Sequence, residues 1–192
     1  MIAEAIHAIA AEIERAAGSR ARLSFLADRA AGMLRAKVAL RGAQCGARVY
    51  VGGPVRVASG GEIAIGSRVI LFGGILPTEL RCARGARLHI GEACVLNYGV
   101  SIDARREVRL GRRCQIGSMV RIVDAGPRGA LPIVIEDDVW IAHGATIEPG
   151  VTLGAGSVVS AGSVVTASVA PLSLAIGNPA RCVSLELIGA SR

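Results

Sequence analysis

Aliphatic residues recur at every sixth position of this chain, and no other feature of the sequence constrains the fold as strongly. The longest uninterrupted run comprises Ile135, Ile141, Ile147, Leu153, Val159 and Val165. A six-residue period fits neither the 3.6-residue period of a helix nor the alternation of an ordinary strand. It is typical of a parallel β-helix, in which each six-residue unit forms a short strand and a turn. The repeated aliphatic residue is therefore predicted to point inward and to stack on its equivalent in the next coil.

Weaker copies of the same period extend toward the N-terminus. They comprise Ile90, Leu96 and Ile102, then Leu110, Ile116 and Ile122, with fainter repeats from Cys45 to Val51 and from Ile65 to Leu71. The composition agrees, because aromatic residues form only 3% of the 192 residues and 25 are glycine. A narrow solenoid core is filled by stacked aliphatic side chains, with small residues at its corners. We predict a mainly β chain with a β-helix from about residue 45 to 170.

The first forty residues have a helical pattern instead. Ile2, Ile6, Ile9 and Ile13 keep helical spacing, and a second pattern follows from Arg22 to Arg35. We predict helices at 2–17 and 22–35 that cap the first coil, since the end of a solenoid must be covered. The predicted division is a helical cap over 1–42, a β-helix domain over 43–183 and a tail over 184–192. A helix on a membrane surface is a weaker alternative, because the polar face of the first helix is acidic.

Composition also limits the compartment and the partners. No apolar run approaches the roughly 20 residues that a membrane span needs, so no stable membrane insertion is expected. Cys45, Cys94 and Cys114 fall on inward positions and are predicted to be buried thiols, which favours a cytoplasmic protein. The net charge of +7 suits an anionic ligand. Nucleic acid is not expected as a partner, because no basic cluster is interleaved with aromatic residues.

Three segments are similar to the hexapeptide-repeat acyltransferases. They are Val139–Gly154 (VWIAHGATIEPGVTLG), Ala161–Thr166 (AGSVVT) and Gly177–Arg181 (GNPAR). Together with Leu96–Asp103 (LNYGVSID), they most resemble the maltose, galactoside and exopolysaccharide O-acetyltransferases. The resemblance spans roughly residues 45 to 183. It implies a left-handed parallel β-helix with an N-terminal α-helical cap, assembled as a homotrimer.

The resemblance further implies that acetyl-CoA, or another acyl-CoA, lies in a groove between neighbouring subunits. Matched to the family, the residues along this groove and toward the nucleotide are Trp140, Ala142, Ser160, Ala161, Gly162, Thr166, Pro179 and Arg181. Small corner residues let a thin pantetheine arm approach the backbone, and arginines suit phosphates. One departure is Ala167, where the family usually has a lysine.

A larger departure concerns the general base. The family presents a histidine on a loop that interrupts the repeat, and the interruption here, 124–132, contains no histidine. Asp124 matches the start of the family's acidic-then-histidine pattern. By counting repeats, Tyr98, Ser118, His143 and Ala161 share one column, so His143 should lie one coil from the pantetheine arm. We predict His143 as the replacement base, Asp124 as a helper or alternative, and Asn97 as the residue that orients the acceptor or the base.

The sequence therefore predicts an acyl-CoA-dependent O-acyltransferase acting on a hydroxyl of a sugar, glycoconjugate or small natural product. The missing loop histidine leaves open a catalytically silent or repurposed trimer that serves as a ligand-binding or scaffold protein. His143 also has a plain alternative role as a corner residue. A metal site is not expected, because His7, His89 and His143 do not share a repeat position.

Overall fold

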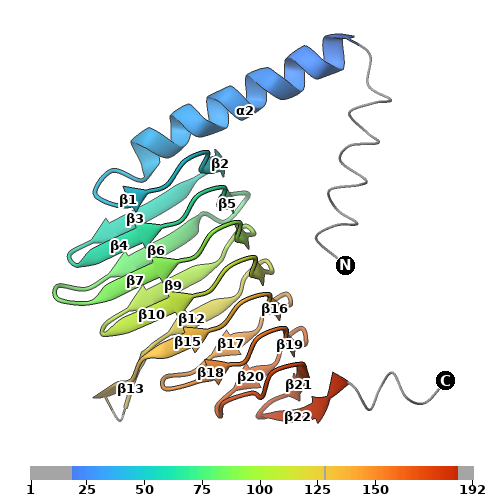
Figure 1. Ribbon diagram of the computed structural model, residues 1–192. Coiled ribbons are helices and arrows are strands. Elements are labelled where there is room, and N and C mark those ends of the chain that lie inside the picture. The colour runs from blue at the N-terminus through green and yellow to red at the C-terminus, as the bar shows by residue number, and fades with distance from the viewer. Residues whose placement is uncertain (1–18, 128, 186–192) are drawn as a thin grey trace.

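The computed structural model is a parallel β-solenoid with one helix, α2 (Ser19–Ala39), at its N-terminal end (Figure 1). It describes residues 19–127 and 129–185. Three sheets of six, eight and six strands run along the solenoid, and their strands are parallel except for the last pair of the eight-stranded sheet. The β-helix expected from the six-residue period is confirmed.

Each coil contributes one strand to each sheet. Sheet A contains β1 (Gln44–Cys45), β4 (Glu62–Ile65), β7 (Arg87–Ile90), β10 (Glu107–Leu110), β15 (Ile133–Ile135) and β18 (Thr152–Leu153). Sheet B contains β2 (Tyr50–Gly52), β5 (Ile70–Phe72), β8 (Val95–Leu96), β11 (Gln115–Ile116), β16 (Trp140–Ile141), β19 (Val158–Val159), β21 (Ser173–Gly177) and β22 (Ala180–Ser184). Sheet C contains β3 (Val55–Ser59), β6 (Thr78–Cys82), β9 (Ser101–Ala104), β12 (Arg121–Val123), β17 (Thr146–Ile147) and β20 (Val164–Val165). Coils are numbered 1 to 6 by their strand in sheet A.

The register stacks the repeated aliphatic residues directly on one another. In sheet B, Leu96 pairs with Ile116, which pairs with Ile141, and the next partner is Val159. All four side chains are fully buried. A coil buries few apolar side chains by itself, so stability comes from stacking neighbours along the axis. The same stacking fixes which corner residues share a column.

Helix α2 covers the first coil only with its C-terminal half. Ala36 and Leu40 are buried, and Gly32 packs so closely on Tyr50 that an added Cβ would lie 2.1 Å from that ring. Leu26 and Leu34 are exposed. The helix predicted at 22–35 is present and is longer at both ends, whereas the helix predicted at 2–17 lies outside the described residues.

Two expectations need correction. Cys45 was predicted to be buried with Cys94 and Cys114, but only the latter two are buried and Cys45 is exposed. The reason is its place in β1, at the edge of sheet A, where a strand from another coil pairs with it on one side only. The sheets also extend past residue 170, because β21 pairs with β19 and then forms an antiparallel hairpin with β22. Within residues 19–127 and 129–185, no helix is long and apolar enough to cross a bilayer.

Candidate active site

The three sheets meet at three corners, which we name by the sheets they join. The A–B corner comprises 46–49, 66–69, 91–94, 111–114, 136–139 and 154–157. The B–C corner comprises 53–54, 73–77, 97–100, 117–120, 142–145 and 160–163. The C–A corner includes 105–106, 124–132, 148–151 and 166–168. Most of the predicted site residues lie on the B–C corner.

The B–C corner aligns His143 with Ala161, as the repeat count predicted. The Met119 N–H donates to Tyr98 O (3.0 Å), the Gly144 N–H to Ser118 O (2.9 Å) and the Gly162 N–H to His143 O (2.8 Å). These bonds link successive coils at equivalent positions. Tyr98, Ser118, His143 and Ala161 therefore form one column along the corner.

His143 is exposed on this column. Among the residues that the structure describes, its imidazole has no hydrogen bond or ion pair. The ring can therefore accept a proton from a ligand without first breaking an internal contact. The backbone N–H groups of His143 and Ala161 also lack an acceptor within the described chain. Two backbone N–H groups without an acceptor and one exposed imidazole thus lie on adjacent coils.

Small residues keep this part of the corner open. A Cβ added at Gly144 or at Gly162 would meet nothing within 4 Å. Ala142 and Ser160 flank these glycines and donate their N–H groups to Val159 O and Ala175 O, both at 2.9 Å. Trp140 lies on the outer face of sheet B, 44% exposed, two residues before Ala142. The five predicted acyl-CoA neighbours in coils 5 and 6, namely Trp140, Ala142, Ser160, Ala161 and Gly162, share one accessible strip.

The residues assigned to the nucleotide end are divided between two corners. The Gly177 N–H donates to Ser163 Oγ (3.1 Å), so the turn that carries Pro179 begins beside the B–C corner of coil 6. Arg181 follows in β22 and is exposed. Thr166, in contrast, lies at the C–A corner, at the other end of β20. Thr166 and Arg181 are thus not brought together within one chain.

Asn97 lies on the B–C corner of coil 3, two coils from His143. Its side-chain Nδ2 donates to Ile116 O (3.3 Å), and its backbone carbonyl accepts the Thr78 hydroxyl (2.9 Å). Asn97 is therefore bound into the corner itself. The structure does not bring its side chain together with His143.

Asp124 has a different environment from the one expected of a helper base. It is fully buried, and its carboxylate accepts the backbone N–H groups of Arg105 (2.7 Å), Arg106 (2.8 Å) and Glu107 (2.7 Å). These three contacts hold the C–A corner of the preceding coil. Asp124 follows strand β12 and His143 precedes the neighbouring strand β17, so the two residues lie at opposite ends of the strands of sheet C. The alternation of inward residues gives a signal for this burial, because Asp124 follows inward Ile122 as Ala104 follows Ile102.

The interruption at 124–132 folds into a short hairpin of β13 (Ala125–Gly126) and β14 (Gly129–Ala130). The Leu131 N–H donates to Asp124 O (2.8 Å), and the Gly150 N–H donates to Leu131 O (3.2 Å). The hairpin therefore packs on the C–A corner of its own chain. Its described residues bring no imidazole, amide or carboxylate side chain toward His143.

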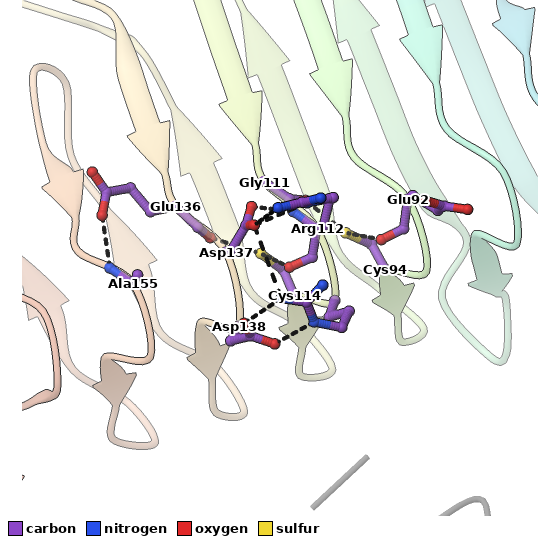
Figure 2. Close-up of polar contacts among 10 residues, drawn as sticks. Glu92, Cys94, Gly111, Arg112, Cys114, Glu136, Asp137, Asp138 and Ala155 are labelled. Atoms are coloured by element: carbon purple, nitrogen blue, oxygen red, sulfur yellow. Dashed lines mark hydrogen bonds and ion pairs between the residues drawn. The ribbon is translucent and has the colours of Figure 1, made fainter. Parts of the chain in front are cut away.

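The A–B corner differs because its polar groups bind one another (Figure 2). Arg112 contacts Asp137 through Nε (2.9 Å), and the Arg112 N–H donates to the same carboxylate (2.8 Å). Arg113 forms a two-point contact with Asp138 (2.6 and 2.5 Å). The backbone N–H of Arg112 lowers the pKa of Asp137, and the Arg113 guanidinium lowers the pKa of Asp138.

Sequence reasoning missed an apolar cluster on the B–C corner of coils 2 to 4. Ile75 is 101% exposed, and Leu76, Tyr98 and Met119 are exposed beside it. A Cβ added at Gly99 would lie 3.3 Å from Met119 Cγ and 3.4 Å from Leu76 Cβ. We call these four residues the apolar ridge. Its sequence signal is a three-residue insertion within 73–77, because Leu71 and Leu80 are nine residues apart where their partners Leu96 and Ile102 are six apart.

No group of three or more His, Cys, Asp or Glu side chains placed to hold a metal ion occurs in residues 19–127 and 129–185.

Comparison with known proteins confirms the hexapeptide-repeat resemblance. Residues 132–167 match the family model described as bacterial transferase hexapeptide (six repeats). This segment includes the strip of small residues and His143.

Solved structures agree on the fold. A hexapeptide-repeat-containing acetyltransferase from Vibrio cholerae O1 biovar eltor, complexed with acetyl coenzyme A, is 36% identical with a TM-score of 0.50. The match covers 53% of this chain and 62% of that one, so this chain spans about three fifths of its length. The polySia-specific acetyltransferase NeuO is 22% identical with a TM-score of 0.55, and the match covers 73% and 74% of the two chains. A hexapeptide transferase family protein from Anaplasma phagocytophilum is 19% identical with a TM-score of 0.60, covering 73% and 76%.

Proposed function

We propose that this protein is an acyl-CoA-dependent O-acyltransferase, with acetyl-CoA as the cosubstrate and a hydroxyl of a sugar, glycoconjugate or small natural product as the acceptor. The observation that carries the proposal is the strip on the B–C corner of coils 5 and 6. There an exposed imidazole and two unpaired backbone N–H groups lie on adjacent coils between small residues. The Vibrio cholerae acetyltransferase that holds acetyl coenzyme A supports the cosubstrate.

The strip suits a pantetheine arm for a physical reason. Pantetheine is an extended chain with two amide groups, whose carbonyls need donors when they leave water. The N–H groups of His143 and Ala161 supply two donors one coil apart. Gly144 and Gly162 leave the approach to the backbone open. In this proposal Trp140, Ala142 and Ser160 border the arm, while Pro179, Arg181 and Thr166 lie toward the nucleotide.

His143 is the proposed general base. An alcohol attacks a thioester poorly while it keeps its proton, and a neutral imidazole accepts a proton near pH 7. The hydroxyl oxygen then attacks the thioester carbonyl, and the thiolate of CoA leaves and takes up the proton. Asp124 serves the corner rather than the proton transfer, because its two oxygens already accept three N–H groups. Asn97 contributes by holding the corner on which the acceptor binds.

A homotrimer is part of the proposal, and the outer face of sheet B supports a contact between copies. The outward column of this sheet is Tyr50, Ile70, Val95, Gln115, Trp140, Val158 and Leu174, with one polar member. The outward column of sheet C includes Arg56, Glu79, Ser101, Arg121 and Thr146. An apolar face of this extent favours burial against a partner. Light scattering at micromolar protein tests the mass, and a monomer would contradict the trimer.

Two measurements on the unaltered protein test the function. Isothermal titration with CoA should show binding, and release of free CoA thiol from acetyl-CoA should depend on an added hydroxyl acceptor. Absence of binding at millimolar CoA would contradict the acyltransferase. CoA binding without turnover over a broad acceptor panel would favour the silent or scaffold protein, which the histidine-free hairpin at 124–132 keeps as the second candidate.

A further inference from the structure

We propose that the N-terminal segment 1–17 of this chain packs along the outward face of helix α2, so that the two form an antiparallel helical pair. The inference goes beyond the proposed function, because it concerns neither the cosubstrate nor the acceptor. It assigns an occupant to an apolar surface that the solenoid leaves uncovered. This surface, which we call the outward stripe, comprises Ala27, Ala30, Ala31, Leu34 and Val38.

The outward stripe points away from the first coil. Gly32, Ala36 and Leu40 are the buried residues at this end of the chain. Residues two positions apart on an α-helix lie about 160° apart around its axis. Leu34 is two positions from Gly32 and from Ala36, and Val38 is two positions from Ala36 and from Leu40. Both side chains therefore face solvent, and they are 65% and 55% exposed.

The stripe has the spacing of a surface that pairs with another helix. Ala27, Ala31, Leu34 and Val38 are separated by four, three and four residues, and all of them are exposed. A helix that packs lengthwise on another helix repeats its apolar contacts at this spacing. Because α2 is apolar toward the coil and apolar on the opposite side, it has the pattern of a helix that is covered on both sides.

Residues 1–17 lie outside the described part of the chain, and their sequence has the matching spacing. Ile2, Ile6, Ile9 and Ile13 are also separated by four, three and four residues. As a helix, each set would extend about 17 Å, so the two apolar faces are equal in length. Large isoleucines on one helix and mainly alanines on the other allow close packing of the two backbones.

The connection between the two segments sets their direction. Gly18 separates the helix predicted at 2–17 from Ser19, where α2 begins. Glycine is common where a helix ends, and helices with a short connection pack as antiparallel neighbours. If the chain reverses at Gly18, the isoleucines come level with the stripe. The resulting levels are Ile9 with Ala27, Ile6 with Ala30 and Ile2 with Leu34.

Charge favours this segment over a second copy of α2. Exposed Arg35 and Lys37 lie on either side of the outward stripe, and Asp28, the one acidic residue of α2, already pairs with Arg35 (3.3 Å). Two such helices placed stripe to stripe would bring like charges together. The N-terminal segment is acidic instead, with three glutamates and one arginine, namely Glu4, Glu12, Glu14 and Arg15.

Disulfide trapping in the full chain tests the contact. Cys45→Ser and Cys182→Ser first remove the two exposed thiols. Addition of Ile9→Cys and Ala27→Cys then places thiols at facing positions, within the reach of a disulfide. Oxidation by copper phenanthroline in air should convert most chains to a disulfide within one chain. Non-reducing electrophoresis should show it at monomer size, and its cysteines 9 and 27 should resist alkylation.

Ala11→Cys with Ala27→Cys in the same background is the matched control. Ala11 is two positions from Ile9 and from Ile13, so it lies on the opposite side of the predicted helix. This pair should stay reduced. Equal trapping in the control, or no disulfide in the Ile9 and Ala27 pair, would overturn the proposal.

Thermal unfolding gives a second measurement, without cysteine variants. Leu34→Ser should lower the thermal midpoint by about 4 °C, since it removes an apolar contact. It should have a smaller effect when Ile2→Ser is already present, because residues in contact are not additive. Leu172→Ser is the control, as Leu172 is also exposed but lies beyond coil 6. Its effect should be the same with and without Ile2→Ser, and additivity for Leu34→Ser as well would contradict the contact.

Two further outcomes would overturn the proposal by showing another occupant. A disulfide between two chains would mean that the segment of a neighbouring copy covers the stripe. Sedimentation of the unaltered protein with phosphatidylglycerol vesicles, lost in Leu34→Ser, would mean that the stripe binds a lipid surface. None of these measurements uses CoA or an acceptor, so they succeed or fail independently of the proposed function.

Discussion

The A–B and B–C corners are built on the same repeat, but their backbone N–H groups differ in how many find a hydrogen-bond acceptor. At the second position of the A–B corner, the N–H groups of Ala47, Arg112 and Ala155 donate to side-chain oxygens of the neighbouring coil, at 3.1, 2.8 and 2.8 Å. The equivalent N–H groups of Ser118, His143 and Ala161 on the B–C corner have no acceptor among the described residues. The N–H groups of Ser67, Glu92 and Asp137, at the same position of the A–B corner, have no acceptor among the described residues either. The A–B corner therefore satisfies three of its six second-position donors, whereas these three donors of the B–C corner are all unsatisfied.

This difference teaches that a repeat fixes the positions of corner groups without fixing their use. Serine, aspartate and glutamate side chains at the A–B corner accept backbone N–H groups of neighbouring coils. Figure 2 shows the aspartate and glutamate contacts. On the B–C corner no described side-chain oxygen, including the Ser118 hydroxyl, accepts a bond from the N–H groups of Ser118, His143 and Ala161. The C–A corner at Asp124 belongs with the closed type. Four substitutions test this comparison.

The largest effect is expected on stability at the C–A corner. Asp124→Asn replaces an oxygen acceptor with an NH2 group facing buried backbone donors, so the free energy of unfolding should fall by about 3 kcal/mol. Urea unfolding followed by circular dichroism measures it. Asp103→Asn is the control, because Asp103 forms an ion pair with exposed Arg105 and should lose less than about 1 kcal/mol. If the two variants lose equal free energies of unfolding, the three hydrogen bonds to Asp124 do not stabilise the C–A corner as inferred.

The next effect is expected on cosubstrate binding. Ala161→Leu fills the open strip, and an overpacked contact of about 2 kcal/mol should weaken CoA binding about thirtyfold. Ala155→Leu makes the same change in the same coil at the A–B corner, where the Ala155 N–H is already bonded to Glu136. Titration calorimetry should find its affinity for CoA unchanged. Weakening by the control to the same extent would place CoA elsewhere.

Removal of the imidazole should act on turnover. General-base help is worth about 10²–10⁴-fold, so His143→Ala should lower kcat by at least about tenfold with little change in CoA affinity. His89→Ala is the control, since His89 is exposed on sheet A, away from the B–C corner. If His143→Ala keeps full activity and Asp124→Asn, shown to be folded, abolishes it, the carboxylate is the base.

The smallest effect belongs to the ion pairs of the A–B corner. The pKa of Asp138 is lowered by Arg113, so its contribution to stability is present above the unfolded pKa near 4 and is lost as pH falls through the lower native pKa. Asp138→Asn should reduce the thermal midpoint slightly at pH 7 and low salt. The difference from the unaltered protein should shrink in 1 M salt and in acid. A deficit that persists under both conditions would mean that packing, not charge, is responsible.

Much of the fold was predictable from local regularity. The six-residue period identified the β-helix and its inward residues, and repeat counting placed Tyr98, Ser118, His143 and Ala161 in one column. The register confirms that column. The predicted burial of Cys45 was wrong, because the six-residue period describes residues of interior coils. It does not say which strand lies at the edge of a sheet, where β1 lies.

The sequence by itself determined the architecture, because side chains stacked at 4.8 Å must repeat in the chain if they are to repeat in the core. It also determined that His143 lies one coil from Ala161. Only the tertiary structure decided that Asp124 is buried on three N–H groups, since those donors come from the preceding coil. Likewise it assembled the ridge from residues 75, 76, 98 and 119, which share no period. A repeat in the sequence specifies which residues stack in the core. The surroundings of inserted residues and of unpaired N–H groups depend on residues from other coils, which only the folded chain brings near them.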